Sequence, residues 1–215
     1  VSSCGMMEPE EIINNYSREN YRGLVITDHF KESYFNSLSD MSWEEKIDQY
    51  MSGYYKVKEL GEKKDIKVIP GIEITFTDEN NDYLVYGIDE DFLKEHNLLY
   101  QSSLKKFNKL VKNEKILIYQ AHPFRGSPAD PQLLDGVEVF NGNPRHDSHN
   151  CQALNFAGEN NLKMISGSDC HQLEDVGRGG ILSQEIIETE EELVDYIKHI
   201  NDTENLIMED VRAEC

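Results

Sequence analysis

The stretch "MISGSDCHQLEDVG", residues 164–177, runs from an apolar segment into a polar one that carries Asp169 and His171. Alternate residues of an extended chain point to the same side, so these two side chains can converge on one point. A carboxylate and an imidazole at one point suit a metal ion. The same sequence is also compatible with a loop that contains a structural histidine. The stretch therefore predicts a buried strand whose end is either a metal site or an ordinary loop.

Apolar runs of this kind alternate with helical stretches along the chain, which is typical of βα units around a parallel sheet. Six or seven strands with helices between several of them predict an α/β barrel. A doubly wound fold is the alternative, but no glycine-rich phosphate loop follows the first strand. Strands are expected at residues 23–29, 66–76, 82–88, 115–123, 136–142, 162–169 and 179–184. Helices are expected at residues 8–21, 42–64, 91–113, 148–161 and 188–200, with serine caps at Ser42 and Ser148.

The length and composition predict one globular domain over residues 1–215 with an acidic surface. The 41 acidic and 21 basic residues give a net charge of −20, which disfavours long nucleic acid and anionic membranes. The longest apolar runs are too short to cross a bilayer. The four cysteines lack CxxC spacing, which favours reduced thiols and a cytoplasmic protein. No feature of the sequence indicates an oligomeric state.

The chain begins at Val1 instead of a methionine, and "VSSCGMMEPEE" has the character of a segment inside a longer chain. We therefore expect further residues upstream of Val1.

Several of the predicted strands end in residues that can bind metal. Asp28 and His29 end one strand, Glu73 lies in the next, His122 ends a third, and Asp169 with His171 ends a fourth. The carboxyl ends of strands are where βα folds place their active sites. Imidazole and carboxylate groups together suit zinc, manganese or iron. One histidine at a strand end is usually structural, but four such ends together indicate a metal site.

The same residues carry a family resemblance. The motifs "TDH", "PGIE", "AHPFR", "VEVFNG" and "GSDCH", in this order, resemble the PHP (polymerase and histidinol phosphatase) superfamily from about Ser2 to Gly180. The resemblance implies a distorted (β/α)7 TIM-like barrel that holds two or three divalent metal ions and hydrolyses phosphoesters. It implies metal ligands at His29, Glu73, His122, Asp169 and His171.

Three positions depart from the family pattern. The family opens with a strand that carries a His-x-His motif, and nothing precedes Val1, so this strand and two ligands are expected upstream. Cys4 stands where many members have an Asp or His ligand. Asp82 stands where many members have a histidine; it is a sixth candidate ligand, or a solvated residue at the start of a strand.

Basic and amide side chains near these motifs are candidates for substrate binding. Arg125 in "HPFR" is the strongest, because a guanidinium group matches phosphate oxygens, although a surface salt bridge is the plain alternative. Asn141 either positions substrate or water or belongs to a turn. The remaining candidates are the loop residues Arg145, His146, His149 and Arg178.

The leading hypothesis is a metal-dependent phosphoesterase that hydrolyses a small phosphomonoester or nucleotide with metal-activated water. Arg125 would stabilise charge in the transition state, and His122, His171 or a metal-bound group would protonate the leaving oxygen. Two alternatives stay open. One is a metal-dependent hydrolase of C–N bonds that uses the same site. The other is a non-catalytic metal-binding or regulatory domain.

Overall fold

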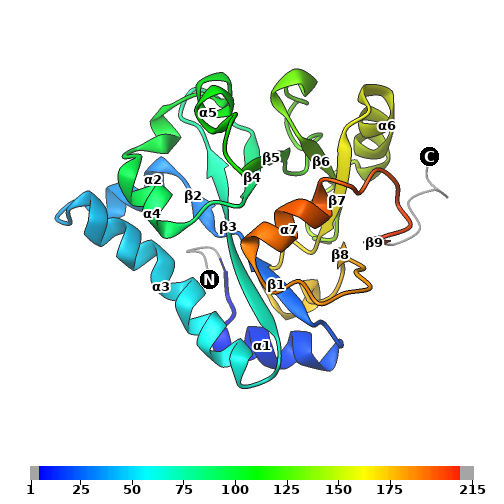
Figure 1. Cartoon of the computed structure of the whole chain (residues 1–215), viewed down its shortest axis with the longest axis horizontal. Helices are drawn as coiled ribbons and strands as arrows, with labels where there is room; N and C mark the ends of the chain where they lie inside the picture. The colour runs from blue at the N-terminus through cyan, green and yellow to red at the C-terminus, as the bar shows by residue number, and fades with distance from the viewer. Residues whose placement is uncertain (1–4, 209–215) are drawn as a thin grey trace.

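The computed structural model describes residues 5–208 and shows a mixed α/β fold built on one curled sheet (Figure 1). Its strand order is β1-β3-β4-β5-β6-β7, and short β2 pairs with β3 beyond the end of β1. The strands are β1 (Gly23–Ile26), β2 (His29–Phe30), β3 (Lys67–Thr75), β4 (Asp82–Tyr86), β5 (Leu117–Gln120), β6 (Gly136–Asn141), β7 (Lys163–Gly167), β8 (Gly180–Ile181) and β9 (Leu206–Ile207).

The helices lie around this sheet. Helix α3 packs on β3 and α1, α6 on β6 and β7, and α7 on β4 and β7. The helices are α1 (Pro9–Arg18), α2 (Glu32–Ser37), α3 (Trp43–Glu62), α4 (Glu90–Glu95), α5 (Leu104–Val111), α6 (Asn150–Asn160) and α7 (Glu190–Ile197). Short 3-10 turns are η1 (Leu99–Gln101), η2 (Pro131–Leu133) and η3 (Leu173–Asp175).

The sheet is mixed, whereas an all-parallel barrel was expected. Strand β4 runs antiparallel to both β3 and β5, while β1 and β2 are parallel to β3 and β6 is parallel to β5 and β7. The cause lies in the connection between β3 and β4, residues 76–81. A parallel neighbour needs a crossover of a dozen or more residues, so this short link forms a hairpin.

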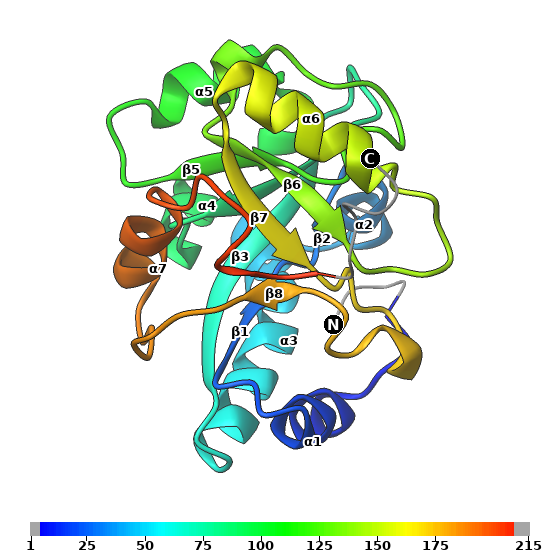
Figure 2. The same cartoon turned by 90° about the vertical axis from the view of Figure 1, so that its right-hand side faces the viewer.

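The strand order begins at β1 and ends at β7, so within residues 5–208 the sheet is a curled half-barrel without pairing between its two ends. Figure 2 looks onto the side where these end strands lie, with short β8 packed against β7. The strand expected at residues 23–29 is present as β1, whose four residues are only half-buried or exposed. An end strand pairs on one side only and leaves its other edge open.

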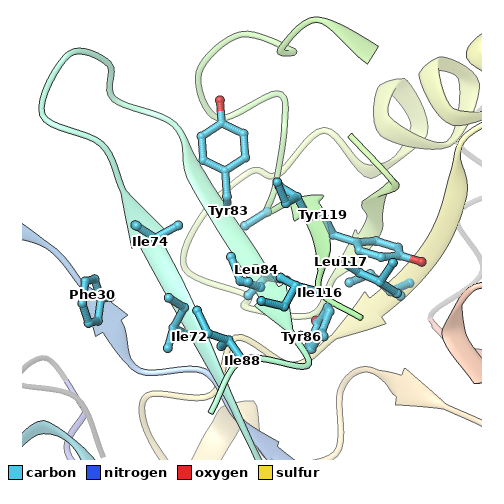
Figure 3. Close-up of a cluster of buried hydrophobic side chains, with 14 of the residues drawn as sticks. Phe30, Ile72, Ile74, Tyr83, Leu84, Tyr86, Ile88, Ile116, Leu117 and Tyr119 are labelled. Atoms are coloured by element: carbon cyan, nitrogen blue, oxygen red, sulfur yellow. The ribbon is translucent and has the colours of Figure 1, made fainter. Parts of the chain in front are cut away.

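The core lies where β3, β4 and β5 meet. Figure 3 shows Ile72 and Ile74 of β3, Leu84 and Tyr86 of β4, and Tyr119 of β5 in one buried cluster. The near-continuous apolar runs of these strands produce this burial on both faces, as expected of strands covered on two sides. The predicted strands of the sheet therefore exist, and their fixed packing gives the strand ends a rigid base.

Two helix predictions were wrong in detail. Residues 91–113 do not form one helix: α4 stops at Glu95, Leu98 has φ of 58°, and α5 starts at Leu104. A left-handed residue cannot continue a right-handed helix. Ser148 does not cap α6, because His149 precedes the helix with φ of 50° and Ser148 is buried. By contrast, Ser42 caps α3 as predicted, in a capping box with Glu45.

Two further expectations concern membranes and thiols. No helix within residues 5–208 has the length and apolar character needed to span a bilayer. The thiol of Cys170 is free, but Cys151 takes part in a disulfide bond, so reduced thiols do not describe both of these cysteines. Cys4 and Cys215 lie outside the described residues.

Candidate metal centre

Six predicted ligands come together at one edge of the sheet. His29 opens β2 directly beside Glu73 of β3, with which it is paired in register. Asp82 opens the antiparallel strand β4, and His122 follows β5. Asp169 and His171 follow β7 and complete the group. The curled sheet thus gathers side chains that are far apart in the sequence.

Glu73 is the centre of the first half of this group. Its Oε2 lies 2.8 Å from Nδ1 of His29, and its Oε1 lies 3.4 Å from Nε2 of His122. Nε2 of His122 also lies 3.8 Å from Oδ2 of Asp82. Glu73, Asp82 and His122 each offer one ligand atom within 4.8 Å of the others. Ligand atoms about 2 Å from one divalent ion lie at most about 4 Å apart. The separations of 3.4 Å and 3.8 Å from His122 are within this limit, so these residues fit a metal ion.

Asp169 and His171 form the second half. Oδ1 of Asp169 lies 3.3 Å from Nδ1 of His171, and the rings of His171 and His29 have centroids 6.2 Å apart. The sequence argument placed Asp169 on an extended strand, but β7 ends at Gly167 and Asp169 has φ of 45°. Asp169 and His171 therefore converge through a turn, and not through the alternation of a strand.

Backbone strain marks two of the candidate ligands. His122 has φ of 27° and Asp169 has φ of 45°, values that residues with a Cβ rarely adopt. Such residues persist only where their surroundings hold them, and they concentrate at functional sites. At His122 the surroundings include the buried carboxylate of Glu138, which accepts the backbone N–H of His122.

The electrostatics of the first half favour a bound cation. Burial raises the pKa of Glu73, but hydrogen bonds with His122 and His29 outweigh it and lower that pKa to about 2. Burial lowers the pKa of His122, but its hydrogen bond with Glu73 and the charge of Glu138 leave it raised. Burial and the charge of Glu73 raise the pKa of Asp82. Neighbouring carboxylates disfavour one another's charge, and a divalent cation between them relieves that cost.

Arg125 is held by the protein through all three of its nitrogen atoms. Nη1 donates to Oδ2 of Asp169 at 2.9 Å, Nη2 to Oδ1 of Asn141 at 2.7 Å, and Nε to Oγ of Ser148 at 3.0 Å. These bonds use three of the five N–H groups of a guanidinium group. Arg125 is therefore oriented at the metal centre with two N–H groups left for a further acceptor.

Sequence reasoning missed Glu138, which is 3% exposed in the middle of β6. Its Oε2 accepts the backbone N–H of His122 at 2.9 Å and Nδ2 of Asn141 at 3.0 Å. Burial raises the pKa of this carboxyl to about 7. An acidic residue between Val137 and Val139 in an otherwise apolar strand was the available signal, because such residues are almost never buried without a partner.

Asp175 was also missed. It is fully buried, and its carboxylate accepts two bonds from Arg145 and the backbone N–H groups of His171 and Gln172. The pKa of Asp175 is lowered, since these bonds outweigh the effect of burial. Asp175 thus fixes the turn that carries His171. A carboxylate two to four residues after a loop histidine gives no distinctive pattern in the sequence.

We expect Asp175→Asn to lower the free energy of unfolding by about 1–3 kcal/mol, because an amide leaves one buried donor without its acceptor. Glu174→Gln in the same turn is the matched control, since the side chain of Glu174 is exposed. Urea unfolding of both variants measures the difference. Equal stability of the two variants would contradict the role assigned to Asp175.

The other predicted substrate residues have different surroundings. Asn141 lines the large cavity beside the metal centre and is bonded to Glu138 and Arg125. Arg145 pairs with Asp175, and Nε of Arg178 donates to the carbonyl of Glu174. Two loop histidines complete the set: His146 is exposed, and exposed His149 lies 3.3 Å from Asp147.

Two hollows adjoin the candidate ligands. The first, of about 710 Å³, lies between β1 and β7, with apolar residues such as Val25 and Ile165 in its walls. It also reaches the candidate ligands His29, Glu73, Asp169 and His171. The second, of about 540 Å³, is a groove that extends from His29 along α3.

Comparison with known proteins gave one match to a family model and several to solved structures. The family model described as PHP-associated matches residues 147–200. A comparison with curated protein sequences gave no match. The family match covers α6, β7 and α7, and it includes Asp169 and His171 of the candidate metal centre.

Three solved structures illustrate the shared fold. PsfC from Pseudomonas syringae is 14% identical, with a TM-score of 0.66 over 94% of this chain and 83% of that chain. A Bacteroides vulgatus two-domain protein containing a predicted PHP-like metal-dependent phosphoesterase is 21% identical, with a TM-score of 0.54 over 80% of this chain and 50% of that chain. An amidohydrolase from Chromobacterium violaceum, with bound sulfate and no metal, is 16% identical, with a TM-score of 0.55 over 91% of this chain and 94% of that chain.

At these identities the structural likeness establishes the fold, and the family match adds a sequence relationship over residues 147–200. The chain therefore shares a PHP-associated sequence segment at residues 147–200 and a fold with the PHP-like protein.

Proposed function

We propose that this protein is a metal-dependent phosphoesterase that hydrolyses a small phosphorylated molecule, either a phosphomonoester or a nucleotide. The observation that carries the proposal is the convergence of Glu73, Asp82 and His122 on a volume that suits a divalent ion, with His29, Asp169 and His171 beside it. Nitrogen and oxygen donors of this kind suit two or three ions of zinc, manganese or iron. The net charge of −20 makes a long nucleic acid an unfavourable substrate.

The residues at the site would have different roles in hydrolysis. Bound divalent ions supply water activation and neutralise phosphoryl oxygens. Arg125, with its two remaining N–H groups, would bind the phosphate, and the loop residues Asn141, Arg145, His146 and Arg178 would line the approach. His122 or His171 would protonate the leaving oxygen, since both are imidazoles beside carboxylates.

We also propose that one further strand, which carries a His-x-His motif, closes the barrel between β1 and β7 and brings this motif to the centre. The half-barrel supports this proposal, because β1 and β7 end the strand order and a cavity of about 710 Å³ lies between them. Closure removes the open edges of a sheet. One further strand beside the six in the order β1-β3-β4-β5-β6-β7 would then give the distorted seven-stranded barrel as one domain.

A hydrolase of C–N bonds is the second candidate. The similarity to an amidohydrolase favours it, although that similarity establishes only a fold. The same imidazoles and carboxylates serve either reaction, because metal ions polarise carbonyl and phosphoryl oxygens alike. The arginine at the site favours phosphate, since a guanidinium group pairs with two phosphate oxygens.

We expect the full-length protein to release phosphate from small phosphoesters in the presence of manganese, zinc or iron. Phosphate release should stop when a chelator is added. Phosphate release from a panel of monoesters and nucleotides, with an amide panel in parallel, measures this. Turnover that persists after exhaustive chelation would contradict the metal dependence. Amide cleavage alone would favour the C–N hydrolase, and metal binding without turnover on either panel would favour a regulatory domain.

A further inference from the structure

The groove along α3 begins at a candidate metal ligand and leads away from the centre. Asp28 and His29 lie at one end, and residues of α1, α2 and α3 form its walls. The groove measures about 540 Å³, which is enough for a small ligand. Its lining is Glu8, Pro9, Asp28, His29, Tyr34, Gln49, Tyr50, Ser52, Gly53 and Lys56.

Helix α3 contributes one face to this groove. Gln49, Ser52, Gly53 and Lys56 are spaced at i, i+3, i+4 and i+7, so they lie along one side of the helix. Gly53 has no side chain and leaves room in the middle of this face. The hydroxyl of Tyr50 donates to the backbone carbonyl of Asp28 at 2.6 Å, which ties α3 to the segment that carries His29. The wall of the groove is therefore fixed relative to the metal centre.

Among the described residues, Lys56 is the one lysine or arginine in the lining of this groove. Its ammonium group makes no hydrogen bond or ion pair with any residue of the described range 5–208, whereas Lys63 on the same helix pairs with Glu59. By contrast, Arg125 and Arg145 form ion pairs with Asp169 and Asp175. Lys56 is thus available for a ligand anion, on a helix face that leads to His29.

Other groups in the groove define what it accepts. The Tyr34 hydroxyl and the Gln49 amide are hydrogen-bond donors without a partner in the described part of the chain. The acids in the lining are Glu8 and Asp28. The Glu8 carboxylate accepts a backbone N–H of the first turn of α1, so it is partly satisfied by that helix. A polar ligand with one anionic group beside Lys56 matches these surroundings.

We propose that this groove binds the part of the substrate that does not react, and that Lys56 contacts a second anionic group there. The proposal rests on the proposed phosphoesterase activity and narrows its substrate class. That class is a phosphoester that carries a further carboxylate or phosphate away from the bond that is cleaved. Lys56 is exposed, so water competes for its charge and the contact gives selectivity more than affinity.

The kinetic test compares esters that carry a second anionic group with matched esters that lack it, such as carboxyalkyl phosphates and alkyl phosphates of equal length. We expect Lys56→Ala to lower kcat/KM for the carboxylated esters roughly 2- to 5-fold, mainly through KM, because the contact exists before and during the reaction. The kcat/KM for the alkyl phosphates should be the same as in the wild-type protein. Lys56→Arg should retain most of the preference, and Lys56→Glu should reverse it.

Lys105→Ala is the matched control, since Lys105 is an exposed lysine of α5 outside both hollows. An unchanged preference for carboxylated esters in an active Lys56→Ala variant would overturn the proposal and leave the phosphoesterase function intact. If no phosphoester is hydrolysed, the proposed function is wrong. A binding measurement then tests separately whether the groove holds an anion. Calorimetry with manganese-loaded protein would then compare carboxyalkyl phosphonates with methylphosphonate. Weaker binding of the former to Lys56→Ala supports an anion site in the groove, and equal binding overturns it.

Discussion

The Asp169→Ala variant is expected to lose bound metal and turnover together. The fall in its kcat/KM should correspond to a loss of at least about 4 kcal/mol of transition-state stabilisation. Asp169 lies 3.3 Å from His171 and 2.9 Å from Arg125, so its carboxylate stands between an imidazole and a guanidinium group. Removing it leaves a bound cation with one anionic ligand fewer and the Arg125 charge without its partner. Both changes weaken cation binding at the same point.

Elemental analysis and phosphate-release kinetics on one protein preparation measure the two losses. Asp147→Ala is the control, because Asp147 is an exposed carboxylate in the loop before α6 with 77% of its side chain accessible. Circular dichroism separates a local loss from unfolding. A variant that keeps both its metal and wild-type turnover would remove Asp169 from the ligand set.

The candidate centre could be predicted from the sequence because its information is local to each strand. An apolar run that stops at His122, or at Asp169 and His171, specifies both a strand and its end. Parallel packing then brings such ends to one edge. The structure brings the six candidate ligands to one edge, although Asp82 reaches it from the start of the antiparallel strand β4.

The remaining features depend on contacts between distant segments. The hairpin between β3 and β4 reverses one strand of the sheet, and the half-burial of β1 follows from its place at the end of the strand order. The partners of Arg125 come from β6, α6's leading loop and the turn after β7, and no spacing along the chain announces them. The burial of Glu138 and Asp175 has the same origin, because packing determines which charged residues are enclosed.

Arg125→Ala tests whether the arginine acts on substrate or on the protein. We expect kcat/KM for phosphoesters to fall by a factor that corresponds to about 2–4 kcal/mol of transition-state stabilisation. This is the cost of losing a charge-assisted contact in a partly desolvated site. The metal content should be unchanged, because Asp169 can still bind a cation when the positive charge 2.9 Å away is removed. Arg125→Lys should restore only part of the loss, since one ammonium group cannot bond Asp169, Asn141 and Ser148 as the fork does.

The metal content of Arg125→Ala decides between two roles. If metal stays and kcat/KM falls for phosphoesters, the two free N–H groups of Arg125 act on the phosphate. If metal and rate fall together, the bonds to Asp169 and Asn141 are the important ones, and Arg125 positions a ligand instead of the substrate. Ser148→Ala separates these contributions further, because it removes only the 3.0 Å bond from Nε and leaves the charge in place. Wild-type kcat/KM in Arg125→Ala on every ester that the protein cleaves would exclude both roles and favour hydrolysis of C–N bonds, for which a phosphate-binding arginine is not required.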